Sequence, residues 1–110
     1  MKLPNGAFAI LDLRKINEYC LSPEHPRGRH RARVFHLVLG LTAEDTLVLA
    51  SALQNAAAKQ EAIQGASDQY GNRFIIDFEI DLKGRTAQIR SCWIVLTGET
   101  VPRFVTCYIL

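Results

Sequence analysis

The chain has 110 residues and a formal net charge of +2, with 13 Lys and Arg against 11 Asp and Glu. Its 48% hydrophobic and 22% charged residues are typical of a soluble globular domain and argue against intrinsic disorder. No apolar run approaches the ~20 residues that cross a bilayer, and residues 1–6 do not read as a secretory signal. We therefore expect one domain, residues 1–110. Three cysteines without CxxC spacing favour structural thiols and the cytoplasm.

The first predicted elements occupy residues 7–28. Residues 7–11 read as a short strand or extended lead-in. Asp12 can cap a helix with one apolar face, formed by Leu13, Ile16 and Cys20. This helix must stop before Pro23, because a residue that precedes proline is pushed out of the helical region. Residues 22–28 then form a loop stiffened by two prolines.

Two more helices are predicted in residues 28–65. The second begins near Gly28 or Arg29 and ends at Gly40, a typical C-terminal cap. Its predicted buried face consists of Ala32, Phe35 and Leu39. An adjacent, more exposed stripe consists of Arg29, Arg33 and His36. The third begins after the cap Thr42 and ends at Gly65, and its predicted buried stripe is Leu49, Leu53, Ala56 and Ile63.

From residue 74 the hydrophobic period changes from 3.6 to 2. Apolar and acidic residues alternate over 74–82, which predicts a strand with one buried and one wet face. A turn at 83–85 leads to a second strand, 86–96, and a loop leads to the last one, 103–110. This order predicts an α+β fold, with N-terminal helices packed on one face of a three- to four-stranded antiparallel sheet.

The charge is concentrated in residues 25–36, which we call the basic segment. It holds all three histidines and four of the nine arginines, and it contains no acidic residue. It therefore carries +4 and leaves −2 for the rest of the chain. Arginine forks match phosphate oxygens, and N–H groups at a helix start attract anions. The segment is thus a candidate phosphate site, the alternative being a solvated helix face.

His25 is the candidate proton carrier, because flanking prolines restrict the position of its ring. A loop histidine bonded to Glu24 or to a carbonyl is the alternative. His30 and His36 are weaker candidates, since each can simply face solvent. The three histidines lie five and six residues apart, which does not suit a metal site, and we expect no metal and no cofactor. In the last strands, Arg90, Arg103, Thr106 and Tyr108 are predicted to converge near the basic segment.

The segments resemble a bacterial family of small, uncharacterised, toxin-like proteins. Its motif is Tyr-x-Leu-Asn-Pro-x-His-Pro-x-Gly-x-x-Lys-Ala-x-x-Phe, followed by a Tyr-Gly element, a Trp-containing strand and a closing Leu-Val-Thr-x-Tyr. The counterparts here are Tyr19, Leu21, Pro23, His25, Pro26, Gly28, Ala32 and Phe35, then Tyr70, Gly71, Trp93 and residues 105–108. Ser22, Arg31 and Phe104 replace the usual Asn, Lys and Leu. The layout is similar to that of the barnase, EndoU and RelE-like ribonucleases, a resemblance of fold.

The resemblance and the charge pattern together predict a toxin-like, metal-independent ribonuclease domain. The expected catalytic residues are His25, Arg31, Thr106 and Tyr108, and the expected substrate-binding residues are Arg27, Arg29, His30, Arg33 and Arg103. RNA and a small acidic inhibitor or antitoxin are the expected partners. A non-catalytic binding module for nucleic acid or an acidic protein is the alternative. The apolar end, residues 108–110, also leaves a homodimer open.

Overall fold

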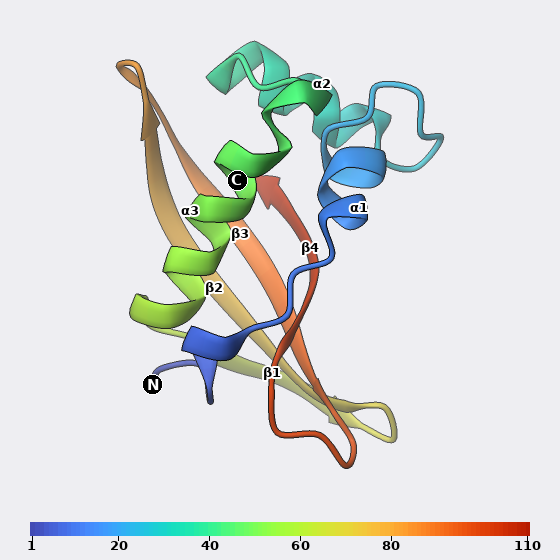
Figure 1. Cartoon of the computed structure of the whole chain (residues 1–110), viewed down its shortest axis with the longest axis vertical. Helices are drawn as coiled ribbons and strands as arrows, with labels where there is room; N and C mark the ends of the chain where they lie inside the picture. Colours follow the sequence, from blue (N-terminus) through green and yellow to red (C-terminus); the bar gives the residue numbers. More distant parts are fainter.

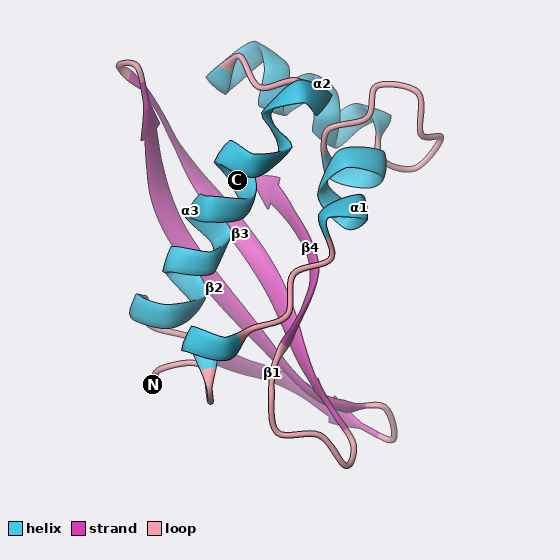
Figure 2. Cartoon of the chain, viewed as in Figure 1, coloured by secondary structure: helices cyan, strands magenta, loops and turns pink.

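The computed structural model describes all residues, 1–110, and confirms the α+β fold (Figure 2). The helices are α1 (Leu13–Lys15), α2 (Arg29–Leu39) and α3 (Thr46–Lys59). The strands are β1 (Ile63–Asp68), β2 (Gly71–Leu82), β3 (Arg85–Leu96) and β4 (Arg103–Ile109). Two 3₁₀ turns, η1 (Gly6–Phe8) and η3 (Ala43–Asp45), and one π-helical turn, η2 (Ile16–Cys20), complete the regular structure.

The four strands form one antiparallel sheet in the order β1-β2-β3-β4. The predicted turn between β2 and β3 is present, and Lys83 and Gly84 both have positive φ, 53° and 83°, as a tight hairpin requires. The predicted alternation over 74–82 is also present, because Phe74, Ile76, Phe78 and Ile80 are buried while the acids between them are exposed. Figure 1 shows the helices gathered over this buried face, with α3 lying across the sheet.

Trp93 is the largest fully buried side chain, and its ring meets that of Phe104 edge to face at 5.4 Å. Its indole N–H donates to Ser91 Oγ at 2.9 Å, and Ser91 Oγ donates to the Ile76 carbonyl at 2.8 Å. The polar atoms that enter the core are therefore hydrogen-bonded, as stability requires. This core supports β3 and β4, which carry part of the candidate site.

The predicted helix boundaries hold for the first two helices. Asp12 accepts the Arg14 N–H at 3.0 Å and caps the first helix, which ends before Pro23. α2 ends at Gly40, whose φ of 71° is left-handed. Leu13, however, is exposed, because α1 gives way to the π-helical turn η2 and the expected face is not continued back to residue 13. No single helix is long and apolar enough to cross a membrane. By length and composition alone, such a stretch is reached only when α2 and Ala43–Lys59 are counted together, and these two are bent by 80° from one another.

The third helix ends earlier than predicted. α3 stops at Lys59, and Gln60 is extended. Residues assigned to the end of the helix instead form β1, in which Ile63 pairs with Ile75 of β2 and is 69% exposed. The lead-in, residues 7–11, is also mixed: η1 covers its beginning, and Ile10 then bridges to Arg103 in parallel. In both segments the extended backbone is hydrogen-bonded to a neighbouring strand. The local hydrophobic pattern does not reveal such pairing.

Candidate functional site

His25 is held by the backbone at the start of α2. Its Nδ1 accepts the N–H groups of Arg27 and Gly28, each at 3.1 Å, and its carbonyl accepts the N–H of Arg29 at 2.9 Å. The N–H groups at a helix N-terminus need acceptors, and His25 supplies two acceptor atoms, Nδ1 and its carbonyl oxygen. Because Nδ1 is an acceptor, the proton of the neutral ring lies on Nε2. Nε2 is therefore the nitrogen that remains for a ligand.

Gly28 lets the His25 loop pack closely against η2. A Cβ at position 28 would lie 2.1 Å from the carbonyl oxygen of Tyr19, a distance at which no side chain fits. The same turn supplies the Tyr19 ring, which meets the His25 ring edge to face with 4.6 Å between centroids. The loop and the turn thus fix the imidazole from both the backbone and the ring side.

Arg31 is fixed between β4 and η2. Its Nη1 donates to Thr106 Oγ1 at 2.7 Å, and its guanidinium carbon lies 4.9 Å from the centre of the Tyr108 ring and 5.8 Å from that of Tyr19. Both distances are within the range of cation–π attraction. No carboxylate forms an ion pair with Arg31. The structure therefore presents a half-buried, oriented cation that has no anion.

A second guanidinium lies beside Tyr108 but is already paired. Arg90 pairs with Tyr108 in the register of β3 and β4 and donates to both carboxylate oxygens of Asp77 at 2.9 Å. Accepting these hydrogen bonds lowers the pKa of Asp77, and donating them raises the pKa of Arg90, to which Tyr108 makes a smaller contribution. This pair borders the site and leaves Arg31 as its unpaired cation.

Cys20 lies beneath Thr106 and was not predicted to belong to the site. Its Sγ is 3.9 Å from Thr106 Oγ1 and 3.8 Å from Cys107 Sγ. The pKa of Cys20 is lowered to about 7, first by the hydrogen bond from Cys107, with smaller contributions from Thr106 and Arg31. Donating that bond and being buried raise the pKa of Cys107. The three cysteines are free thiols.

The structure brings together four predicted residues, His25, Arg31, Thr106 and Tyr108, with Tyr19 as the residue that touches both His25 and Arg31. Tyr19 is the first residue of the motif resemblance and lies six residues before His25, but it was not predicted as a site residue. Cys20 and Thr106 are 86 residues apart, so no local signal predicts their contact.

The predicted substrate-binding residues are placed differently. Arg27, Arg29, His30 and Arg33 are exposed. Arg103 donates to both oxygens of Glu99, at 2.9 and 3.0 Å, which lowers the pKa of Glu99 and raises that of Arg103. Arg103 therefore already has a carboxylate partner, whereas the exposed residues of the basic segment have none.

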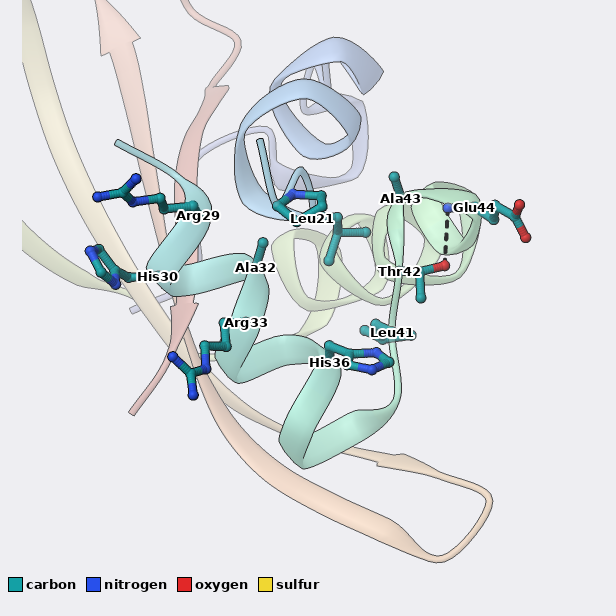
Figure 3. Close-up of a pocket in the computed structure, with 11 residues that line it drawn as sticks. Leu21, Arg29, His30, Ala32, Arg33, His36, Leu41, Thr42, Ala43 and Glu44 are labelled. Carbon is teal, nitrogen blue, oxygen red and sulfur yellow. Dashed lines mark hydrogen bonds between the residues drawn. The ribbon is translucent and has the colours of Figure 1, made fainter. Parts of the chain in front are cut away.

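A hollow of about 870 Å³ lies on the other side of α2 from Arg31. In Figure 3, the side chains of Arg29, His30 and Arg33 extend from α2 on the side away from Thr42, Ala43 and Glu44, and Leu21 and Ala32 lie between the two groups. His36, Leu41 and Pro23 complete the lining. The predicted exposed stripe of α2, residues 29, 33 and 36, thus faces this hollow.

Comparison with known proteins identifies a family and a solved structure of similar fold. The model of the family described as "Domain of unknown function (DUF6883)" matches residues 2–110. No curated protein matches the chain. A chain in a structure of a contact-dependent growth inhibition toxin–immunity protein complex from Klebsiella pneumoniae 342 has the same fold, with a TM-score of 0.69 and 17% sequence identity. The alignment covers 92% of this chain and 99% of that one.

Proposed function

The chain belongs to the DUF6883 family, and we propose that in it the α+β fold serves as a toxin-like, metal-independent ribonuclease domain. One observation carries the proposal: Arg31 is oriented by two rings and a hydroxyl, has no carboxylate partner, and shares Tyr19 with His25. An oriented cation without an anion, next to an imidazole whose Nε2 has no partner in the protein, suits a phosphodiester. The likeness of fold to a chain from a toxin–immunity complex adds support.

Cleavage by 2′-hydroxyl attack needs no metal when the protein supplies charge and proton transfer. The 2′-oxygen forms a bond to phosphorus while the bond to the 5′-oxygen breaks, which leaves a 2′,3′-cyclic phosphate and a 5′-hydroxyl. One proton moves in net from the 2′-oxygen to the 5′-oxygen. For His25 to take the 2′-hydroxyl proton, its ring gives up the two N–H contacts at Nδ1 and holds its own proton there, which leaves Nε2 as the proposed base. The Tyr108 hydroxyl is the proposed donor to the departing 5′-oxygen, and a proton returns from His25 to Tyr108 after cleavage.

Arg31 stabilises the negative charge that develops on the phosphate oxygens. Thr106 accepts a hydrogen bond from this guanidinium and so orients it. Arg27, Arg29, His30 and Arg33 contact phosphates further along the RNA, where exposed cations act mainly through long-range attraction. Arg103 contributes only after exchanging Glu99 for a phosphate.

A small acidic protein is the proposed inhibitor. The basic segment carries +4 without an acidic residue, and an acidic surface placed over the start of α2 would match this charge. The solved chain of similar fold comes from a complex of a toxin with its immunity protein, which supports a partner of this kind.

The experiment is cleavage of total RNA by the purified protein in the presence of EDTA. We expect cleavage by the wild type, loss of cleavage by His25→Ala and by Arg31→Ala, and retention by Arg85→Ala, which removes an exposed arginine outside the site. Products should end in a 2′,3′-cyclic phosphate. Equal activity in all four proteins, or activity only without chelator, would contradict the proposal. Salt-sensitive RNA binding without cleavage would identify the alternative, a binding module.

A further inference from the structure

The hollow beside α2 combines an apolar floor with cationic side chains along one side. Its floor is lined by the apolar side chains of Leu21, Ala32 and Leu41, each of which is at most 5% exposed. Arg29, Arg33 and His36 lie at i, i+4 and i+7 along the same helix, so they follow one side of the hollow. None of these three forms an ion pair, and Glu44 is the single acid in the lining.

We propose that this hollow binds one nucleotide unit of the RNA, with the base over the apolar floor and a phosphate against Arg29 and Arg33. The inference rests on the proposed function and adds a binding subsite to it. The volume of about 870 Å³ falls within the range of roughly 300–1,000 Å³ found for small-ligand sites. An apolar floor with cations on one side matches the two halves of a nucleotide, a flat ring system and an anion.

The hollow and the His25 site meet at one loop. Pro23 lines the hollow, and His25 follows two residues later. The N–H of Arg29, another lining residue, donates to the His25 carbonyl at 2.9 Å. An RNA strand that passes around the start of α2 therefore reaches Arg31 on one side and the hollow on the other. The bound base lies outside the cleaved linkage and gives the enzyme a preference for sequence.

An acidic peptide is the competing occupant, because its carboxylates match the same cations. The two occupants differ in what they offer the floor: a nucleotide places a flat ring on Leu21 and Leu41, whereas an acidic side chain places nothing there. Comparison of a nucleotide with the free anion and with the uncharged nucleoside separates these contributions.

The experiment is titration of 5′-AMP into the full wild-type chain, followed by ¹H–¹⁵N NMR. The nucleotide has no linkage to cleave, so binding is measured independently of catalysis. We expect shifts at the amides of residues 36 and 41–44, and Arg33→Glu should weaken binding by about tenfold or more, as expected for loss of a charge-assisted contact. Arg85 lies beside Gly40 but does not line the hollow, so Arg85→Glu makes the same charge change outside it and should leave the Kd within about twofold.

Three results would overturn the inference. Shifts confined to Thr106, Tyr108 and their neighbours would place the nucleotide in the His25 site alone. Equal binding of inorganic phosphate, or of a poly-glutamate peptide, would show that the hollow recognises charge only. Equal weakening by Arg33→Glu and Arg85→Glu would show attraction without a site. Binding of AMP by a protein that does not cleave RNA would contradict the proposed ribonuclease and support the nucleotide site. Cleavage of RNA by a protein that does not bind AMP would support the ribonuclease and contradict the nucleotide site.

Discussion

The two sides of helix α2 carry the same kind of residue under opposite conditions. On the side toward β4, Arg31 is half-buried and held by Thr106, Tyr108 and Tyr19. On the side toward the hollow, Arg29 and Arg33 are exposed and have no partner. Four arginines that look equivalent in the sequence therefore differ in freedom, and the fold decides which of them can act on a defined atom.

The difference has an energetic consequence. An arginine side chain carries about 2 kcal/mol of rotamer entropy, and Arg31 has already lost much of it in the folded chain. A phosphate that binds Arg31 does not have to order it, whereas one that binds Arg29 or Arg33 does. We therefore expect the β4 side to contribute to the reaction step and the hollow side to contribute to affinity.

Removing the Phe35 ring should disrupt both sides of α2, so that the difference between the β4 side and the hollow side is lost. Its ring is fully buried under α2 between the two sides, and Phe35→Ala should cost about 3–5 kcal/mol of unfolding free energy. Chemical denaturation measures the loss, and RNA cleavage and AMP binding should decline together as the variant unfolds. Leu37→Ala is the matched control, because this side chain is 66% exposed. A stable Phe35→Ala protein that loses only one of the two activities would show that α2 does not couple them.

Replacing the two kinds of arginine should sharpen the comparison. Arg31→Gln should lower kcat for RNA cleavage by about 10²–10³-fold, the usual cost of losing an oriented charge-stabilising group. Arg33→Gln should act mainly on KM and by less than about tenfold, with an effect that shrinks as salt rises. Steady-state kinetics on a defined RNA at two salt concentrations provide the measurement. Equal effects of the two changes on kcat would remove the difference between the sides.

The smallest expected effect concerns acid. Arg90 lowers the pKa of Asp77, so this carboxylate stabilises the fold above its ordinary pKa and the contribution is lost as pH falls through the lowered value. The pair is partly exposed, so Asp77→Asn should cost under about 1 kcal/mol near neutral pH, and the difference from wild type should vanish near pH 2. Urea midpoints over this pH range test it. Glu44→Gln, beside the hollow and without an ion pair, should show no such convergence. A loss of unfolding free energy that grows as the pH falls would contradict this prediction.

The fold was predicted where the side-chain pattern itself is periodic. Residues 74–82 alternate because one face of β2 is buried, and Ala32, Phe35 and Leu39 are spaced to face the core from α2. β1 was missed because all six of its residues are exposed, so neither alternation nor a buried stripe marks it. Its strand character comes from pairing with β2, which is a property of the partner as much as of the segment.

The site was predictable only in part for a related reason. The flanking prolines suggested His25, and the charge pattern, the strand positions and the motif resemblance suggested Arg31, Thr106 and Tyr108; the structure places these four candidates together. Charge alone did not separate Arg31 from Arg29, since the partner that orients Arg31 lies 75 residues away. Arg103 was grouped with them by strand position, but Glu99, four residues earlier, takes its guanidinium.

The close approach of Gly28 to Tyr19 constrains how this sequence can change over generations. Because the backbone carbonyl of residue 19 occupies the space of a Cβ at residue 28, we expect glycine at 28 and the length of chain between the two positions to be kept in relatives. We expect single substitutions among the surrounding charges to be tolerated more easily than one inserted or deleted residue in this interval. The distance from the turn η2 to this glycine should then mark distant relatives better than the number of arginines that follow.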